Sequence, residues 1–346
     1  SFPMCRDEPG ALLSVLSIPQ FQLIDPNDLE KRRTIGGGGF GDVSFALWKG
    51  APVAVKVLRV QAAQGDTLRR LADEARTLAS LRHPNTVLFI GATLSPSGCA
   101  LVTEYMPGGS VFELIHARRG GGGLGWAVRL LVLQSAAHGM AYLHAKGILH
   151  RDLKSANLLL DSLERPRVVK LCDFGLSLAV DASLGASLAA FGTPQWCAPE
   201  VLRSDSFGPA SDVYSFGVVC WELAELDNQP FGTMSPIRVA HEVAYNNLTL
   251  QLRAEAAAAC PAGITPLLRS CLRAKPTERP TFDALVATLD TLSATPDRLA
   301  RALAERAAAD EAVGGGPAPV GGDDQGAAVP RVPVVSSTRA VAHTVQ

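Results

Sequence analysis

The chain has 346 residues, of which 47% are hydrophobic and 19% charged, so it can bury a sizeable core in one large domain or two smaller ones. Its formal net charge of −1 argues against a general nucleic-acid binder, which would carry a basic excess. The longest charge-free run, 84–103, is interrupted by Gly91, Pro96 and Gly98, which argues against a membrane span.

Residues 1–28 contain four prolines and only short apolar runs, which indicates an irregular lead-in. From Leu29 onward the pattern becomes regular. Residues 43–48 alternate in polarity as a strand does, and after a short turn residues 52–58 form a second apolar run. The two runs together predict a β-hairpin.

A helix is expected over 66–82, where apolar residues recur at helical spacing up to the stop signal at Pro84. Two strand-like runs follow at 86–91 and 99–104. With the hairpin, these segments make a β-rich part of about 75 residues that includes one helix.

Beyond Pro107 the character changes to long amphipathic stretches separated by loops, with a flexible glycine insert at 120–123. Helices are predicted at 126–146, 211–226, 236–246 and 281–293. The fold class is therefore α+β, with a small β-rich part followed by a larger helical part. Residues 294–346 are expected to be a low-complexity, disordered tail.

The seven cysteines are scattered, odd in number and never spaced as CxxC, which favours reduced thiols over a disulfide framework or a zinc site. No signal peptide is apparent, so a cytoplasmic location is expected. The chain begins with Ser1 and not with methionine, which favours a fragment of something longer.

A glycine cluster lies just before the predicted hairpin. Glycines 36, 38 and 41 satisfy the spacing GxGxxG, and backbone without side chains can approach a polyphosphate closely. Four consecutive glycines in a glycine-rich chain could equally form a flexible loop. A dinucleotide-binding fold would need a helix directly after the loop, and here a second strand follows. We therefore reject a dinucleotide site.

Lys56 ends the run Val53-Ala54-Val55-Lys56 on the strand after the glycine loop. The ordinary alternative for such a residue is an edge lysine that extends to water. A functional lysine needs a carboxylate to hold it, and Glu74 on the following helix is the candidate.

The most specific signal is His150-Arg151-Asp152-Leu153-Lys154-Ser155-Ala156-Asn157. Asp173-Phe174-Gly175 follows, and Ala198-Pro199-Glu200 comes after it. Each triplet is common by itself, but their order and spacing are not.

These motifs resemble the signature set of the eukaryotic protein kinase family, and the resemblance covers about residues 29–293. Within that family, His83-Pro84-Asn85, Gly192–Glu200 and Ser211–Gly217 are similar to the tyrosine-kinase-like group, which includes Raf-like and plant MAP-kinase-kinase-kinase-like enzymes. The resemblance implies a bilobal fold with an N-lobe over 29–104, a hinge over 104–108 and a C-lobe over 109–293.

By this resemblance, Lys56 holds the α- and β-phosphates of ATP and pairs with Glu74. Asp152 accepts the proton of the substrate hydroxyl, and Lys154 neutralises charge on the γ-phosphate. Asn157 and Asp173 bind Mg²⁺, with Mn²⁺ as an alternative, because oxygen ligands suit a hard cation.

The resemblance also implies a nucleotide site between the lobes. It comprises Ile35, Gly36, Gly37, Gly38, Gly39, Phe40, Gly41, Asp42, Val43, Ala54, Lys56, Thr103, Glu104, Met106 and Leu159. In that site Val43, Ala54 and Leu159 would sandwich the adenine, and the backbone of Glu104 to Met106 would pair with its edge. Ordinary core packing is the alternative for Ala54 and Leu159.

The expected function is an ATP-dependent kinase that phosphorylates serine or threonine of protein substrates in intracellular signalling. Lys154 and Thr193 resemble the lysine and threonine that serine/threonine kinases carry at these positions, so the resemblance favours serine and threonine over tyrosine, with dual specificity open. The hydroxyl residues between Asp173 and Ala198 indicate an upstream kinase or regulator, although Leu178 stands where some such kinases have a basic residue. The alternatives are a catalytically weak ATP-binding scaffold and the cytoplasmic kinase portion of a longer receptor or multidomain protein.

Four further residues are expected to be structural. Glu200 and Arg279 match a buried ion pair of the family, and Asp212 would hold the catalytic loop from below. Cys172, beside Asp173, is expected to be a small buried residue and not an accessible thiol.

Overall fold

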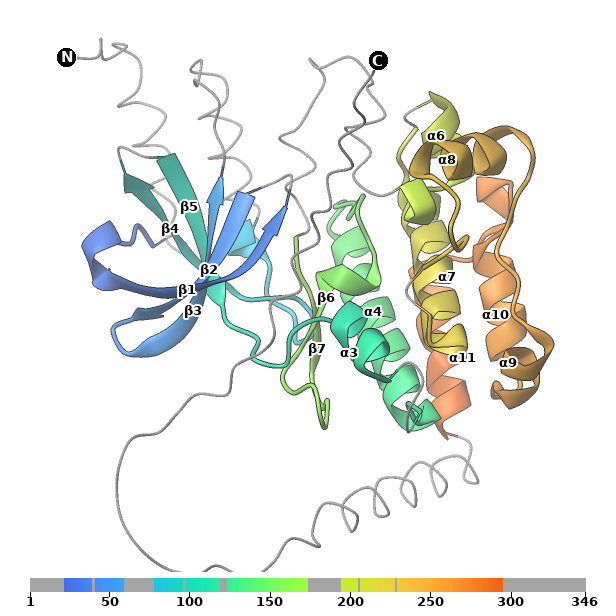
Figure 1. Ribbon diagram of the computed structural model, residues 1–346, viewed down its shortest axis with the longest axis horizontal. Coiled ribbons are helices and arrows are strands. Elements are labelled where there is room, and N and C mark those ends of the chain that lie inside the picture. Colours follow the sequence, from blue (N-terminus) through green and yellow to red (C-terminus); the bar gives the residue numbers. More distant parts are fainter. Residues whose placement is uncertain are drawn as a thin grey trace, which may run out of the picture.

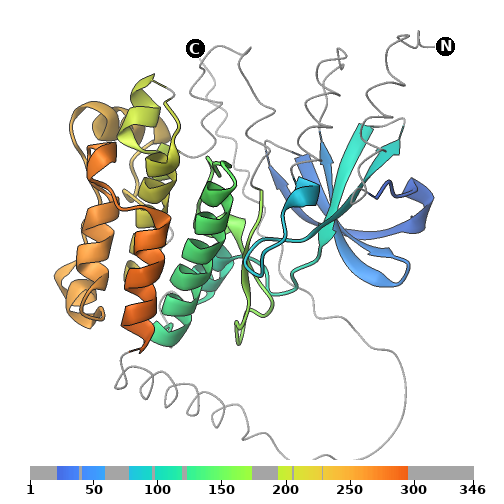
Figure 2. The same cartoon turned by 180° about the vertical axis from the view of Figure 1, so that it is seen from behind.

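The structure, a computed structural model, describes residues 22–38, 41–58, 78–95, 98–118, 123–173, 194–204, 206–227 and 229–294. A sheet occupies one end of the molecule and a group of helices the other, with a small hairpin between them (Figure 1). The view from behind shows the same division (Figure 2). This is the two-lobed α+β architecture that the sequence predicts.

The sheet of the N-lobe is antiparallel throughout, with the strand order β1-β2-β3-β5-β4. Its strands are β1 (Leu29–Gly38), β2 (Gly41–Trp48), β3 (Ala51–Leu58), β4 (Phe89–Ser95) and β5 (Gly98–Glu104). β2 and β3 form the predicted hairpin, which turns at Lys49 and Gly50, both with positive φ. The register of β1 against β2 shifts twice, between Lys31 and Arg33 and between Thr34 and Gly36.

A segment before the first strand covers the β4 edge of this sheet. The Ala92 N–H donates to Gln22 O at 3.1 Å, and the Ile24 N–H donates to Ala92 O at 2.9 Å, which is a parallel bridge. A Cβ at position 91 would lie 2.1 Å from Gln22 O, so Gly91 permits this close approach. The 3-10 helix η1 (Pro26–Asp28) then leads into β1.

The two faces of the sheet belong to different hydrophobic clusters. Val102 packs with Val53 and Val55 in a small cluster of the N-lobe, whereas its neighbour Leu101 packs in the large cluster that includes the helices. Side chains alternate across a strand, so successive residues of β5 serve opposite faces. The sheet is thereby buried on both sides along its centre.

The C-lobe begins after the hinge with two helices and the small β6-β7 hairpin and continues with a helical group. Its elements are α3 (Val111–Arg118), α4 (Trp126–Ala145), η2 (Ser155–Asn157), β6 (Leu158–Leu160), β7 (Val169–Leu171), η3 (Pro194–Trp196), α6 (Pro199–Ser204), α7 (Pro209–Glu225), α8 (Pro236–Tyr245), α9 (Ala254–Ala259), α10 (Ile264–Cys271), η4 (Pro276–Glu278) and α11 (Phe282–Ala294). The four predicted helices correspond to α4, α7, α8 and α11.

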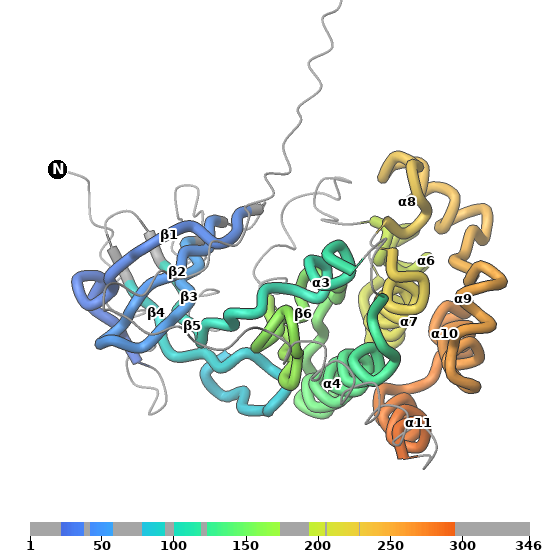
Figure 3. Tube along the Cα trace, turned by 60° about the horizontal axis from the view of Figure 1, so that its bottom comes forward, coloured from blue at the N-terminus to red at the C-terminus, as the bar shows by residue number. Residues whose placement is uncertain are grey.

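Helix α7 is the centre of this lobe. All residues from Ser211 to Cys220 are buried, and the helix lies between α4 and α10 in two views (Figures 1 and 3). α7 approaches α10 closely at Gly217, where a Cβ would lie 2.8 Å from the Cys271 Cβ. Buried polar groups generally need hydrogen-bond partners. Buried side chains of α7 that have such partners include Ser211, Asp212, Ser215 and Glu222. The buried Tyr214 hydroxyl has none among the described residues.

One strand prediction was wrong in its bounds. The run predicted as a strand over 86–91 enters the sheet only at Phe89. Before that, the Val87 N–H donates to Leu171 O and the Leu171 N–H donates to Asn85 O, both at 2.8 Å. The backbone of residues 85–87 therefore pairs with β7 of the C-lobe, and only Leu88 O, which accepts from the Glu104 N–H of β5, already faces the sheet. Of the helix expected over 66–82, residues 78–80 are helical, and 59–77 lie outside the described residues.

Candidate active site

The glycine cluster joins the first two antiparallel strands. Gly36 pairs with Val43, Gly37 with Asp42, and Gly38 with Gly41. Gly39 and Phe40, at the tip, lie outside the described residues. The predicted position of the glycine cluster where one strand passes to the next is thus confirmed for residues 36–38, and Ile35 lies just before them on β1.

Lys56 lies on β3 and reaches the C-lobe. Its Nζ is 2.7 Å from Oδ1 of Asp173, the second residue after β7, and its side chain is 12% exposed. This contact brings together two site residues separated by 117 positions. Glu74, the carboxylate predicted to hold Lys56, lies outside the described residues, so that pairing remains a prediction.

A short loop carries Asp152, Lys154 and Asn157. Lys154 Nζ lies 2.7 Å from Asp152 Oδ2 and 3.0 Å from Oδ1. Asn157 Nδ2 donates to Asp152 O at 2.7 Å and to Asp152 Oδ2 at 3.0 Å. The Cys172 N–H donates to Asn157 O at 3.0 Å, which places Asp173 next to this loop. Lys56, Asp152, Lys154, Asn157 and Asp173 are therefore linked in one site.

Asp212, at the start of α7, holds the loop from below, as expected. Its side chain is 1% exposed and accepts the N–H groups of His150 and Arg151, each at 2.9 Å. The His144 Nε2 lies 2.9 Å from the same carboxylate. Arg151 has a φ of +64° and Asp173 a φ of +59°, conformations that non-glycine residues adopt rarely and mostly where the surroundings impose them. The backbone on both sides of the site is thus held in unusual conformations.

The apolar residues predicted to line the nucleotide site are partly exposed. Val43, Ala54 and Leu159 have intermediate exposure, although the residues on either side of Ala54 and of Leu159 are buried. Core packing would bury them like their neighbours, so this pattern favours lining over the core alternative. Thr103 pairs with Ala54 across β3 and β5, as a residue at the back of the site would.

The end of β5 is fixed by Glu104. Its N–H donates to Leu88 O at 3.0 Å, and its Oε1 accepts from the Leu88 N–H and from Lys170 Nζ, each at 2.6 Å. Sequence reasoning missed this link between β5 and β7. It also means that the Glu104 N–H is used inside the protein, so this group cannot pair with a nucleotide. Met106, further along the predicted hinge, is buried.

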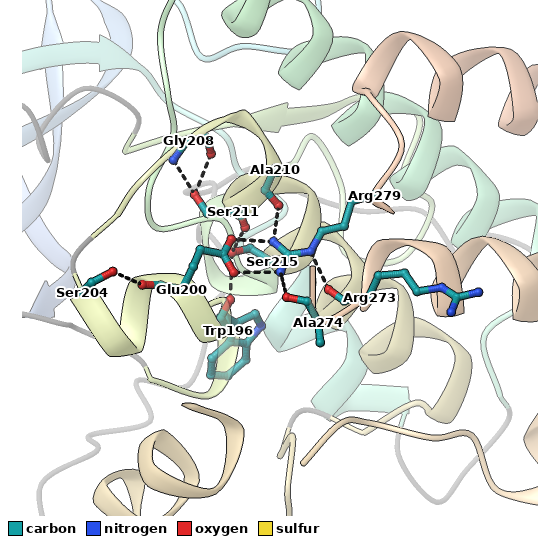
Figure 4. Close-up of polar contacts among 10 residues, drawn as sticks. All are labelled: Trp196, Glu200, Ser204, Gly208, Ala210, Ser211, Ser215, Arg273, Ala274 and Arg279. Carbon is teal, nitrogen blue, oxygen red and sulfur yellow. Dashed lines mark hydrogen bonds and ion pairs between the residues drawn. The ribbon is translucent and has the colours of Figure 1, made fainter. Parts of the chain in front are cut away.

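The segment after the site is anchored by the predicted Glu200–Arg279 pair (Figure 4). Arg279 Nη1 and Nη2 donate to the two oxygens of Glu200 at 2.6 and 2.8 Å, and its other bonds go to backbone carbonyls. Those carbonyls belong to Ala210, Arg273 and Ala274. The Arg279 side chain is 0% exposed, so this charge is compensated wholly by protein groups.

Three titratable groups near the site have raised pKa values: the half-buried Cys172 and Cys197 and the buried Glu222. Burial, with a contribution from the Asp173 carboxylate, raises the pKa of Cys172 well above its usual value, and burial raises that of Cys197 to about 12. Both thiols are therefore protonated at neutral pH. Cys172 is only half-buried, so the expectation that it is a small buried residue was wrong. Burial raises the pKa of Glu222 on α7 to about 8. Sequence reasoning missed Glu222, although a carboxylate inside the apolar stretch Val218–Leu223 was the available signal.

A comparison with family profiles finds that residues 29–289 match the family described as "Protein tyrosine and serine/threonine kinase". The serine/threonine-protein kinase CTR1 of Arabidopsis thaliana is 39% identical over 277 residues, which cover 78% of this chain and 32% of that protein. Mitogen-activated protein kinase kinase kinase 10 of Homo sapiens is 36% identical over 303 residues, 84% of this chain and 30% of the relative. The chain thus spans about a third of the length of these relatives. Among the described residues, no helix is long and apolar enough to cross a membrane.

Proposed function

Since this chain belongs to the protein tyrosine and serine/threonine kinase family, we propose that it transfers the γ-phosphoryl group of ATP to serine and threonine hydroxyls of proteins. The observation that carries the proposal is the contact between Lys56 of the N-lobe and Asp173 of the C-lobe, beside the Asp152 loop. Relatives named as serine/threonine kinases support the substrate class.

The residues of this site fit a magnesium ion. Asp173 offers carboxylate oxygens, and Asn157, whose Nδ2 is used on Asp152, offers its amide oxygen. Among the described residues no group of three or more His, Cys, Asp or Glu side chains could hold a metal. Mg²⁺ suits such a sparse set because it takes many ligands from water and phosphates. When bound, the ion would neutralise charge on the phosphates of ATP.

The chain's own residues then supply alignment and charge. Lys56 would bind the α- and β-phosphates, and Lys154 would face the transferred phosphoryl group. Asp152 would orient the substrate hydroxyl and accept its proton, with Lys154 Nζ and Asn157 Nδ2 fixing the carboxylate. Asp212 accepts two backbone N–H groups of the loop and so would hold Asp152 in place before substrate binds. A carboxylate that is already in position lowers the free energy needed to reach the transition state.

The half-exposed residues Val43, Ala54 and Leu159 would contact the adenine, with Thr103 behind it. The glycine turn between β1 and β2 would cover the phosphates, since a backbone without side chains can approach them closely. Glu74 remains the proposed partner that holds Lys56. We also propose that the protein acts on protein substrates in cytoplasmic signalling. The name of the human relative suggests another protein kinase as one substrate to test.

The main alternative is a protein that binds ATP and acts as a scaffold without useful turnover. The test is phosphate transfer from radiolabelled ATP to a generic protein substrate, compared between the wild type and Asp152→Asn, followed by phosphoamino-acid analysis. Phosphoserine and phosphothreonine that disappear in Asp152→Asn would support the proposal. ATP binding with no transfer by the wild type would favour the scaffold, and phosphotyrosine alone would refute the substrate class.

A further inference from the structure

Helix α7 carries a row of polar side chains inside the core of the C-lobe. Ser215 and Glu222 follow Asp212 by three and ten residues, so the three share one face of the helix. All three are buried. Asp212 binds the start of the Asp152 loop, and Ser215 Oγ donates to Trp196 O at 2.8 Å (Figure 4).

Glu222 joins two segments that are distant in sequence. The Ser155 hydroxyl donates to Glu222 Oε1 at 2.6 Å, and the Trp196 Nε1–H donates to Oε2 at 2.9 Å. Glu222 and Ser155 are both 0% exposed. The ion pairs found among the described residues include none with Glu222, so its carboxyl group is held by neutral donors.

The two segments serve different sides of the site. Ser155 lies three residues after Asp152 and opens η2, which ends at Asn157. Trp196 is the last residue of η3 and is followed by Cys197. The charges of Asp152 and Lys154 both affect the pKa of the Cys197 thiol, so this segment borders the site. Glu222 therefore connects the loop that carries the reactive side chains to the segment that borders them.

We propose that Glu222 is a positioning residue for phosphoryl transfer: through Ser155 and Trp196 it fixes the Asp152 loop against the segment Pro194–Ala198. This rests on the proposed function of the site. Since Ser215 already holds the Trp196 carbonyl, the indole bond is not required to fasten the main chain. The indole bond instead connects Trp196 to Ser155 through the Glu222 carboxyl group. A displacement of one segment should therefore also displace the other.

An apolar residue at position 222 would fill the core without the cost of burying a carboxyl group. A purely structural role predicts that Ser155 and Trp196 act independently, whereas a link predicts coupling. The experiment is a double-mutant cycle in the full chain with Ser155→Ala and Trp196→Phe. We expect each change to slow turnover about fivefold and the double variant to be within about twofold of the slower single variant, because coupled sites are not additive.

The KM for ATP should stay within about twofold in these variants, because Lys56 and Asp173 do not contact Glu222. Glu222→Gln should keep turnover close to that of the wild type, since an amide can accept from the Trp196 indole and donate to the Ser155 oxygen. Glu222→Leu should behave like the double variant. Trp221→Phe is the matched control, because the Trp221 indole bonds to Gln251 O on the outer side of α7.

A second measurement does not depend on catalysis. Amide hydrogen exchange over residues 150–157 should become faster in Trp196→Phe but not in Trp221→Phe, and Trp196→Phe should add nothing to Glu222→Leu. Unchanged exchange over 150–157 in Trp196→Phe, or multiplicative kinetic effects in the cycle, would overturn the inference. A wild type that transfers no phosphate would refute the proposed function, and the exchange data would still decide the role of Glu222.

Discussion

Glu222 also predicts how the stability of this protein depends on pH. Replacing it by glutamine keeps the shape and hydrogen-bonding capacity of the side chain but removes its titration. Burial raises the pKa of the carboxyl group from 4.5 to about 8, so the folded protein retains a proton that the unfolded chain releases. The Glu222 carboxyl group therefore makes the folded state more stable at low pH than at high pH.

The sign and size follow from proton linkage. Below pH 4.5 the group is neutral in both states and has no effect. As pH rises towards 8 the wild type loses stability relative to Glu222→Gln, and above that value the loss is complete. At about 1.4 kcal/mol per pKa unit, the difference in unfolding free energy between the two proteins should change by about 4 kcal/mol from pH 5 to pH 9.

The assay is urea unfolding of both proteins at several pH values between 5 and 9. Other titrating groups affect both curves equally, so the difference between the curves reports Glu222. The wild type should become progressively less stable than Glu222→Gln. Parallel curves, whose difference changes by less than about 1 kcal/mol, would show that burial does not raise the pKa of the Glu222 carboxyl group in the folded protein.

Three further predictions concern catalysis, anchoring and the sheet edge. Asp152→Asn should slow phosphoryl transfer to protein by about 100- to 1000-fold while the melting temperature stays nearly constant, and retained activity would contradict the assigned role. Arg279→Leu leaves a carboxylate and three carbonyls without their donor, so urea unfolding should show a loss of about 3–5 kcal/mol; a loss below about 1 kcal/mol would refute the importance of the pair. Gly91→Ala would place a methyl group 2.1 Å from Gln22 O, so amide exchange over 22–24 should accelerate, whereas Gly208→Ala, with open space around it, should not change it.

Much of the site could be predicted because its residues occur in short, ordered motifs. Within the loop from His150 to Asn157, the contacts of Asp152 with Lys154 and Asn157 are local in sequence, although the loop is also held by Asp212. The contact between Lys56 and Asp173 spans the two lobes and could be expected only from the resemblance. No periodicity in the sequence relates a strand residue to a distant loop.

The parts that were missed depend on tertiary contacts. The run from Thr86 to Gly91 looks like one strand, but the backbone of residues 85–87 pairs with β7, which periodicity cannot reveal. α10 (Ile264–Cys271) was overlooked because it is short and contains Pro266, although Ile264, Leu267, Leu268 and Cys271 have helical spacing and are buried. Glu222 looks like a surface residue by type, and its partners lie far away in the sequence.

The two outer strands of the N-lobe sheet are protected in different ways. On one side, Gln22 and Ile24 bond to the N–H and C=O of Ala92, so the middle of β4 is covered by a preceding segment. On the other side, β1 carries the exposed charged residues Glu30, Lys31, Arg32 and Arg33, and its two register shifts interrupt a regular ladder. Both features disfavour pairing of an outer strand of this sheet with a strand of another molecule.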